Sequence, residues 1–311
     1  MANQKKHINI YLLLPIISGT CWGTAGIFVR NLDEAGLDNI TINFSKFTVA
    51  AMLMGLAMLI INRKAFKIDI RDLPILTGIG IFGALFLNYA YTEAVIRTSL
   101  SLAAVLLCLA PVFVLIFGAV LFGEKMTRTK LICISMAIFG SILLSGLLDD
   151  GGTLPWDTIG FLFGLSSAVA NASYTILSKI ATNKGYGSMT IYFYSYILIL
   201  AFMIPFVDFT AIGNYLVSEP VAAPMNFFGF VVWTSLLPCV IYTVAVRHAD
   251  AGKVATLASG AEPVSSMVTG IFMYHEIPSI LGFSGMFLTV TALVLLIKVE
   301  EKEDTNEEDF T

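Results

Sequence analysis

Apolar residues occur in long runs along almost the whole chain, with short polar stretches between them. Each run is continuous for about 17 to 22 residues, the length that a helix needs to cross roughly 30 Å of hydrocarbon. The strands of a membrane barrel would instead alternate polar and apolar residues over about ten positions. The pattern therefore predicts an all-α integral membrane protein with ten transmembrane helices. They are expected at 10–29, 40–61, 73–94, 102–122, 131–148, 159–180, 191–207, 227–246, 254–274 and 280–299.

Composition excludes an ordinary water-soluble fold. Of the 311 residues, 57% are hydrophobic and 13% are charged, whereas a soluble domain carries roughly 25% charged residues. The mean hydropathy is +0.83. Ten helices use about 200 residues, which leaves no room for a soluble catalytic or nucleotide-binding domain. The net charge of −4 comes largely from the acidic segment 300–311, which is predicted to be a solvated, frayed tail.

The basic residues indicate how the chain is oriented in the membrane. With both termini placed in the cytoplasm, all but three of the 18 Lys and Arg residues fall on the cytoplasmic side. The exceptions are Arg30 and Arg97, which fall outside, and Lys46, which lies within a span. Cytoplasmic loops carry an excess of Lys and Arg. We therefore expect a multi-pass protein of the cell (inner) membrane with both termini in the cytoplasm.

The chain resembles itself at a spacing of 151 or 152 residues. Residues 91–95 (Tyr-Thr-Glu-Ala-Val) recur as 242–246 (Tyr-Thr-Val-Ala-Val). The same spacing pairs Pro111 with Pro263, Gly118 with Gly270, Glu124 with Glu276 and Thr127 with Ser279. Because each half contains an odd number of helices, the second half must enter the membrane in the opposite orientation, as in the inverted repeats of secondary transporters. We expect two five-helix repeats, at 8–148 and 157–299.

These motifs resemble a known family. The chain has Trp22-Gly23 in its first helix, a Tyr-x-Ala-like end to the third, Pro111 in the fourth, and Gly123-Glu124 after it. This pattern is similar to the EamA domain of the drug/metabolite transporter superfamily. Two departures are Lys46, where such domains often have Arg, and Ala170-Asn171 in place of the tryptophan and glycine in the second half. The resemblance implies alternating-access transport of small metabolites, often export of amino acids across the bacterial inner membrane.

Two charged residues at membrane depth are the first candidates for a binding site. A charge at the bilayer centre costs about 2.5 to 3.5 kcal/mol on insertion scales. Lys46 shares a helix face with Asn39, Asn43 and Ala50 and could attract a substrate carboxylate or phosphate; alternatively, its side chain snorkels toward the interface. Glu262 could exchange a proton at mid-membrane, or it could satisfy backbone groups freed by Pro263.

Further candidates are polar and aromatic residues inside other spans. Asn171 and Tyr174 follow one stripe of the sixth helix and could line a cavity, although helix-to-helix hydrogen bonds would also explain them. Trp22 lies away from the interfacial belt where tryptophan usually collects. Pro111 and Pro263 are predicted to interrupt helices as a pair of hinges, whereas Glu124 and Glu276 are interpreted as structural. The remaining candidates for substrate binding are Asn88, Tyr91 and Tyr242.

Patterns typical of enzymes, metal sites or nucleic-acid binding are absent or misplaced. The four cysteines lie in apolar spans, and the three histidines are scattered. The Gly-x-Gly-x-x-Gly string at 78–83 lies inside a span with no strand before it. We therefore predict a protein that is not an enzyme, with no metal or cofactor and no nucleic-acid partner. Glycine pairs such as Gly19 and Gly23 suit close helix contacts, either within the bundle or between the protomers of a homodimer.

The combined prediction is a secondary transporter in the lipid bilayer that exports small molecules, with amino acids or related compounds as the expected substrates. One alternative is an exchanger of nucleotide sugars or sugar phosphates, which a second deep cationic residue would favour. An alternative of another class is an intramembrane enzyme, which would need an acid, a base and a nucleophile together at membrane depth.

Overall fold

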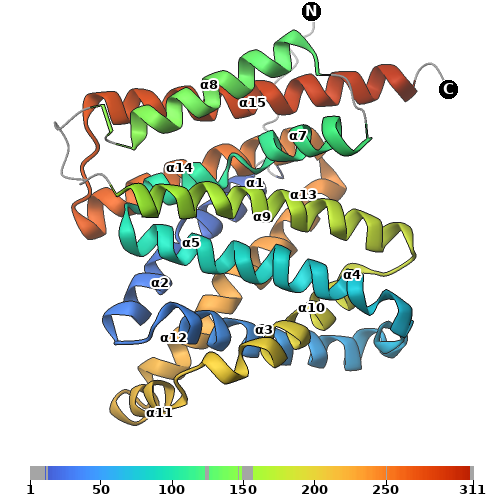
Figure 1. Ribbon diagram of the computed structural model, residues 1–311, viewed down its shortest axis with the longest axis vertical. Helices are drawn as coiled ribbons and strands as arrows, with labels where there is room; N and C mark the ends of the chain where they lie inside the picture. The colour runs from blue at the N-terminus through green and yellow to red at the C-terminus, as the bar shows by residue number, and fades with distance from the viewer. Residues whose placement is uncertain are drawn as a thin grey trace, which may run out of the picture.

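The computed structural model of the chain describes residue 11 and residues 13–122, 126–145, 147–148, 157–249 and 251–308. Every regular element in these ranges is a helix. The long helices lie side by side and run across the view of Figure 1 from left to right. A helix satisfies its own backbone hydrogen bonds, which is what a chain crossing a lipid bilayer requires.

Between residues 13 and 148, the described part of the chain forms eight α-helices and two short 3-10 helices. They are α1 (Leu13–Gly23), α2 (Ala25–Glu34), α3 (Asn39–Ile61), η2 (Arg63–Phe66), η3 (Ile70–Asp72), α4 (Leu73–Gly78), α5 (Phe86–Arg97), α6 (Leu100–Leu107), α7 (Ala110–Phe122) and α8 (Arg128–Leu144). The second half comprises α9 (Thr158–Asn183), α10 (Ser188–Met203), η5 (Ile204–Phe206), α11 (Phe209–Ser218), α12 (Ala222–Val231), α13 (Leu237–His248), α14 (Ala251–Tyr274) and α15 (Ile280–Glu308). A π-helical segment joins α4 to α5 (η4, Ile79–Leu85), and another joins α12 to α13 (η6, Val232–Leu236).

Eight helical segments of the described chain are long and apolar enough to cross a membrane. They cover Leu13–Glu34, Asn39–Ile61, Ile70–Arg97, Leu100–Val120, Thr158–Asn183, Ser188–Phe206, Ala222–His248 and Ile280–Val299. The two other predicted spans correspond to α8, which has 17 residues, and α14, which has 24 residues and contains Glu262. The prediction of a multi-pass, all-helical membrane protein is confirmed, and the count of ten spans stays a prediction.

The structure interrupts one of the two predicted proline hinges and leaves the other helical. Before Pro111, the chain turns at Cys108 and Leu109, between α6 and α7. Around Pro263, in contrast, α14 is continuous, so the prediction of a helix break there is wrong. A proline inside a helix removes one backbone hydrogen bond, and the flanking turns can keep the helix intact. Sequence analysis also placed no break in the first span, where a turn at Thr24 separates α1 from α2.

Glycines let several helix pairs pack with their backbones almost in contact. A Cβ added at Gly19 would lie 2.3 Å from the Ala258 carbonyl oxygen of α14, and one at Gly140 of α8 would lie 2.6 Å from the Gly285 carbonyl oxygen of α15. A side chain at Gly160 would likewise collide with Thr98. These close contacts lie within the protein, so the glycine pairs are explained by packing inside the bundle.

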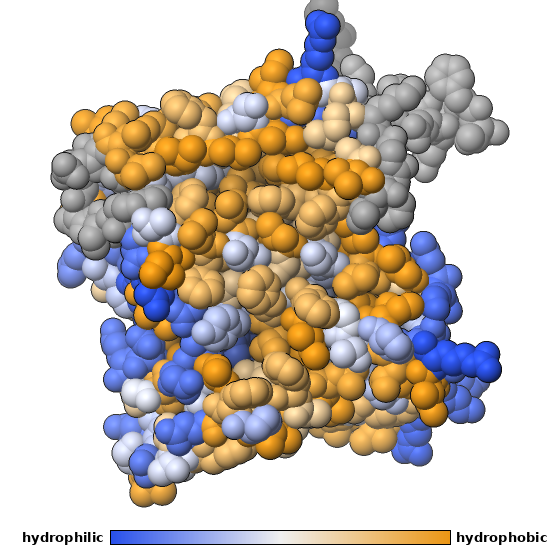
Figure 2. Space-filling model, in the orientation of Figure 1, coloured by the Kyte–Doolittle hydropathy of each residue, from blue (hydrophilic) through white to orange (hydrophobic). Residues whose placement is uncertain are grey.

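The bundle has two polar ends and an apolar belt between them. One end, at the left in Figure 1, contains the C-terminal part of α2, α11 and the connection from α14 to α15; we call it the Arg30 end. The other, at the right, contains the connections from α3 to α4 and from α9 to α10; we call it the Lys184 end. Figure 2 shows orange, hydrophobic residues across the middle of this face and most blue ones toward the left and right margins. This distribution fits helices that cross a bilayer from one end to the other.

The last helix, α15, continues to Glu308. The acidic segment therefore begins as an extension of this helix, where the sequence suggested a frayed tail. Glu124 lies outside the described residues.

Candidate functional site

A cavity of about 310 Å³ lies between α6, α7, α9, α14 and α15. Its lining consists of Leu107, Cys108, Ala110, Pro111, Val114, Asn171, Thr175, Ser259, Glu262, Leu293 and Ile297. Three predicted site residues, Pro111, Asn171 and Glu262, thus meet in one space although they come from different parts of the chain. Most of the wall is apolar, and a few polar groups converge on it, as is usual for small-molecule sites.

Glu262 is the acidic group of this cavity, and it lies midway along α14. Cys108, at the break between α6 and α7, lines the same cavity. Tyr91 of α5, another predicted site residue, is not part of this lining. No Lys or Arg belongs to the cavity lining, so no charged side chain of the lining neutralises this carboxyl. The alternative interpretation was that the Glu262 side chain caps backbone carbonyl groups freed by Pro263. Among the described contacts there is no hydrogen bond from the Glu262 carboxyl to such a carbonyl group.

Lys46 points into the bundle and not toward the membrane interface. Its Nζ donates a hydrogen bond to the Asn88 Oδ1 at 2.7 Å and lies 4.8 Å from the centre of the Phe230 ring on α12. Asn88 is itself fixed, because its amide donates to the Ala84 carbonyl at 2.8 Å. An ammonium group has three donors. In the described structure only the bond to Asn88 is formed with the protein, which leaves donors for an anionic ligand.

Asn43 belongs to a buried network between helices, so its predicted place in a substrate cavity is wrong. Its amide donates to the Asn39 Oδ1 at 2.6 Å and to the Thr92 Oγ1 at 3.3 Å, and it is 1% exposed. Asn39 in turn donates to a Glu93 carboxylate oxygen at 3.0 Å. A polar stripe on a membrane helix can face water or another polar helix. Here the stripe faces α5.

The aromatic candidates form two separate groups. Tyr174 stacks on Tyr192 with ring centres 6.3 Å apart, and Tyr192 lies 6.0 Å from Tyr196. In the second group, the Trp22 ring of α1 lies 5.8 Å from the Tyr242 ring of α13. The lining of the Glu262 cavity includes neither group, nor the pair of Lys46 and Asn88. The structure therefore arranges the predicted residues in several clusters along the interior.

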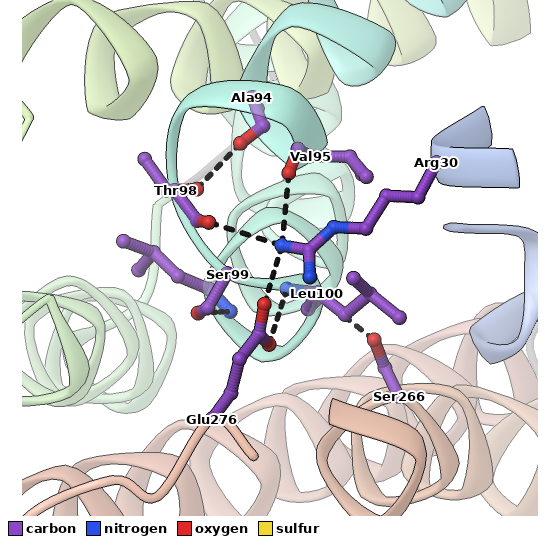
Figure 3. Close-up of polar contacts among 9 residues, drawn as sticks. Arg30, Ala94, Val95, Thr98, Ser99, Leu100, Ser266 and Glu276 are labelled. Atoms are coloured by element: carbon purple, nitrogen blue, oxygen red, sulfur yellow. Dashed lines mark hydrogen bonds and ion pairs between the residues drawn. The ribbon is translucent and has the colours of Figure 1, made fainter. Parts of the chain in front are cut away.

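A cluster that sequence analysis missed joins three segments at the Arg30 end (Figure 3). Arg30 of α2 forms an ion pair with Glu276, which lies between α14 and α15. The same guanidinium donates to the carbonyl oxygens of Val95 and Thr98, each at 3.2 Å. A Glu276 carboxylate oxygen accepts the Leu100 N–H at 3.0 Å. Burial raises the pKa of Glu276, while Arg30 and the Leu100 N–H favour the ionised carboxylate.

The cluster contacts the start of α6, where residues 100–106 are packed inside the protein; we call these residues the α6 plug. Leu100 and Ser101 are both fully buried, as are Val105 and Leu106 further along the helix. The Ser266 hydroxyl of α14 donates to the Leu100 carbonyl at 2.7 Å and ties the start of this helix in place. The Glu262 cavity begins at Leu107, immediately beyond the plug. Along α6, buried side chains therefore separate the cavity lining from the Arg30 cluster.

The one signal for this cluster in the sequence was the match of Glu124 and Glu276 at the repeat spacing. We interpreted both as structural because each ends an apolar span three residues before a good helix N-cap, Thr127 or Ser279. No group of three or more His, Cys, Asp or Glu residues that could hold a metal ion occurs within the described ranges.

Comparisons with known proteins agree with this architecture. The sequence model of the EamA-like transporter family matches residues 9–146 and 158–298. An uncharacterised transporter of Archaeoglobus fulgidus is 26% identical over 267 residues, covering 84% of this chain and 86% of its own. The pseudopaline exporter of Pseudomonas aeruginosa is 24% identical, covering 93% of this chain and 96% of its own. A protein of Streptantibioticus cattleyicolor named "Probable terminal-alkyne amino-acid exporter" is also 24% identical, covering 92% and 91%.

A solved crystal structure superposes with a TM-score of 0.62 at 16% sequence identity and covers 94% of this chain and 98% of its own. This similarity shows that the fold is one already seen in a crystal structure.

Proposed function

The chain belongs to the EamA-like transporter family, and from that premise we propose that it is a secondary transporter that exports an amino acid or a related small compound by alternating access. The observation that carries the proposal is the cavity with Glu262 and Asn171, which the buried side chains of the α6 plug separate from the Arg30 cluster. Two relatives named as exporters, one of pseudopaline and one of an alkyne amino acid, support this substrate class. All of the relatives given above are named as transporters or exporters, which agrees with the prediction that the chain is not an enzyme.

Several features support two inverted repeats as the basis of this mechanism. The family model matches the chain twice, in segments close to the predicted repeats at 8–148 and 157–299. The π-helical segments η4 and η6 occupy related places, because residues 81–85 of the first lie 151 positions before Val232–Leu236. With the predicted orientation, the Arg30 end faces outward, so the structure corresponds to a state closed to the outside.

We assign different roles to the predicted residues according to their surroundings. Lys46, positioned by Asn88, attracts the anionic group of the substrate. Asn171 contacts the substrate in the cavity, and Glu262 binds the proton that couples transport to the membrane gradient. Tyr174 and the pair of Trp22 and Tyr242 shape the passage, and the break before Pro111 is the hinge between α6 and α7. A sugar-phosphate exchanger is disfavoured because the cavity lining contains no Lys or Arg that could act as a second cation alongside Lys46, which itself lies outside the lining.

Removing Lys46 or Asn171 tests the substrate site. Lys46→Ala and Asn171→Ala are each expected to lower counterflow of amino acids in proteoliposomes about tenfold or more, because a hydrogen bond to a charged group contributes roughly 1.5 to 3 kcal/mol. Lys179→Ala and Asn214→Ala remove the same chemical groups from exposed positions and should leave the rate unchanged. Unchanged counterflow in both site variants would contradict these assignments.

Glu262→Gln tests proton coupling while it preserves the shape of the carboxyl group. The wild-type protein should accumulate substrate against its gradient when a pH gradient is imposed across the vesicle membrane. The variant should still exchange substrate but should lose the response to pH, because an amide does not titrate. Glu219→Gln, at an exposed position after α11, is the matched control. A Glu262→Gln protein that still responds to the gradient would show that the coupling proton binds elsewhere.

A further inference from the structure

A hollow of about 960 Å³ opens at the Lys184 end, separate from the Glu262 cavity. Two connections form its walls: residues 62–70, between α3 and α4, and residues 184–190, between α9 and α10. These segments are far apart in the sequence. In Figure 1 they lie at the right-hand ends of the helices.

Hydrogen bonds between the two connections hold the rim of the hollow in shape. The Tyr186 hydroxyl donates to the Asp72 carboxylate at 2.8 Å and accepts the Asp69 N–H at 3.1 Å. Thr190 donates to the Ala65 carbonyl oxygen at 3.0 Å. Tyr194, one turn further along α10, donates to the Phe66 carbonyl at 2.7 Å. A rim that is fixed before binding loses little conformational entropy when a ligand arrives.

The hollow carries a surplus of positive charge. Lys64, Lys67 and Lys184 contribute to its lining, together with the acidic Asp69. Lys184 pairs with Asp72, whose carboxylate keeps the pKa of this lysine above its ordinary value. Neither Lys64 nor Lys67 forms an ion pair with a residue that the structure describes, so their charges are available to an anion.

Backbone groups in the wall suit an anion as well. Gly187 is the residue immediately before the 16-residue helix α10. Because glycine has no side chain, it does not cap the N–H groups of the first turn of this helix. Such N–H groups, with the positive end of the helix dipole, attract phosphate. Nothing lies within 4 Å of a Cβ placed at Gly185 or Gly187, so an oxyanion could approach the backbone closely.

The surroundings of the hollow favour a lipid over a soluble anion. The last turns of α3 present apolar side chains beside it, with Ile60 75% exposed and Ile61 68% exposed. Aromatic rings lie at the same level, where Phe66 packs edge-on against Phe193 at 5.3 Å. Aromatic residues typically collect at the boundary between lipid chains and headgroups. A phospholipid could therefore place its chains along α3 while its phosphate enters the hollow.

We propose that this hollow is a binding site for the phosphate headgroup of an anionic phospholipid, held by Lys64, Lys67 and the first turn of α10. The site is independent of the transport pathway. It is at the end that the sequence predicts to be cytoplasmic, where clustered basic residues attract anionic lipids.

Lipid binding to the purified full-length protein, measured by native mass spectrometry, tests the proposal. Short-chain phosphatidylglycerol should bind, and phosphatidylcholine of the same chain length should bind much more weakly. The double variant Lys64→Gln, Lys67→Gln should bind phosphatidylglycerol about 25-fold more weakly, at about fivefold per lysine. Arg128→Gln combined with Arg247→Gln removes two exposed charges from the same end outside the hollow and should change binding less than about twofold.

A second variant keeps the test decisive if the lysine variant folds poorly. Ser188→Asp places a carboxylate in the first turn of α10, where it favours the helix but repels a phosphate. It should weaken lipid binding without lowering the thermal stability. Equal binding by the lysine variant and its control would overturn the proposal. Displacement of phosphatidylglycerol by an equal concentration of inorganic phosphate would identify a soluble anion as the ligand and overturn the assignment to lipid.

Discussion

Replacing Gly23 by alanine is expected to destabilise the protein by about 3 kcal/mol or more, because the new methyl group has no space. A Cβ at this position would lie 2.1 Å from both the Glu262 carbonyl oxygen and the Ser265 hydroxyl of α14. The carbonyl belongs to the backbone, so it can yield only if α1 and α14 separate. Such a separation would also disturb the cavity that contains the Glu262 carboxyl. The measurement is thermal or denaturant unfolding of the purified protein in detergent.

Gly260→Ala is the matched control for this effect, since it makes the same change within α14. There the nearest neighbour of the added Cβ would be the Val290 methyl at 3.8 Å, an ordinary packing distance. We expect this variant to be about as stable as the wild-type protein, or slightly more stable, because alanine favours helices over glycine by about 1 kcal/mol. If Gly23→Ala unfolds no more readily than Gly260→Ala, the close approach of α1 to α14 is not a feature of the folded protein.

Arg30→Gln is expected to open the Arg30 end and to stop transport. It leaves the Glu276 carboxylate, which is 6% exposed, with the Leu100 N–H as its only remaining partner in this cluster. Removing one partner of a buried ion pair costs roughly 3 to 5 kcal/mol. The closed arrangement loses that stabilisation, whereas an open arrangement with a hydrated carboxylate does not. The balance between the two states should therefore shift toward the open one.

The opening can be measured by chemical labelling in the plug. A Ser101→Cys substitution introduces a thiol at a position that is now fully buried, and a membrane-impermeant maleimide reports its exposure. Labelling above that of the same protein without the new cysteine should rise strongly with Arg30→Gln. Arg97→Gln is the control, because it breaks an exposed pair with Glu93 that contributes about 1 kcal/mol at most. Equal labelling in the two variants would argue against a latch at Arg30.

The helices were predictable because each lipid-facing segment must be apolar over its whole length. The points where they break were not, since these depend on packing between distant segments. The turn at Thr24 occurs inside a run that looks continuous, and the π-helical segments have no distinctive composition. Proline alone was an ambiguous guide: the chain breaks before Pro111 and stays helical through Pro263.

The site was predictable only as a set of residue types. Charge at membrane depth singled out Lys46 and Glu262 as candidates, but Asn88, which bonds Lys46, and Cys108, which shares the cavity of Glu262, come from other segments, and helical periodicity does not reveal them. Asn43 shared a face with Lys46 and was misinterpreted because that face packs against another polar helix. Glu276 was undervalued, because a glutamate between two helices is usually solvated, and its burial depends on an arginine near the start of the chain.

The size of the Glu262 cavity limits what the closed protein can hold. At roughly 30 Å³ per molecule in the liquid, its volume of about 310 Å³ equals that of about ten waters. A solute of amino-acid size would displace most of this hydration and leave the walls in contact with it. A nucleotide sugar would need helices to move apart before it could enter. Under the proposed function, the spacing of the helices would therefore select substrates by size before any polar contact is made.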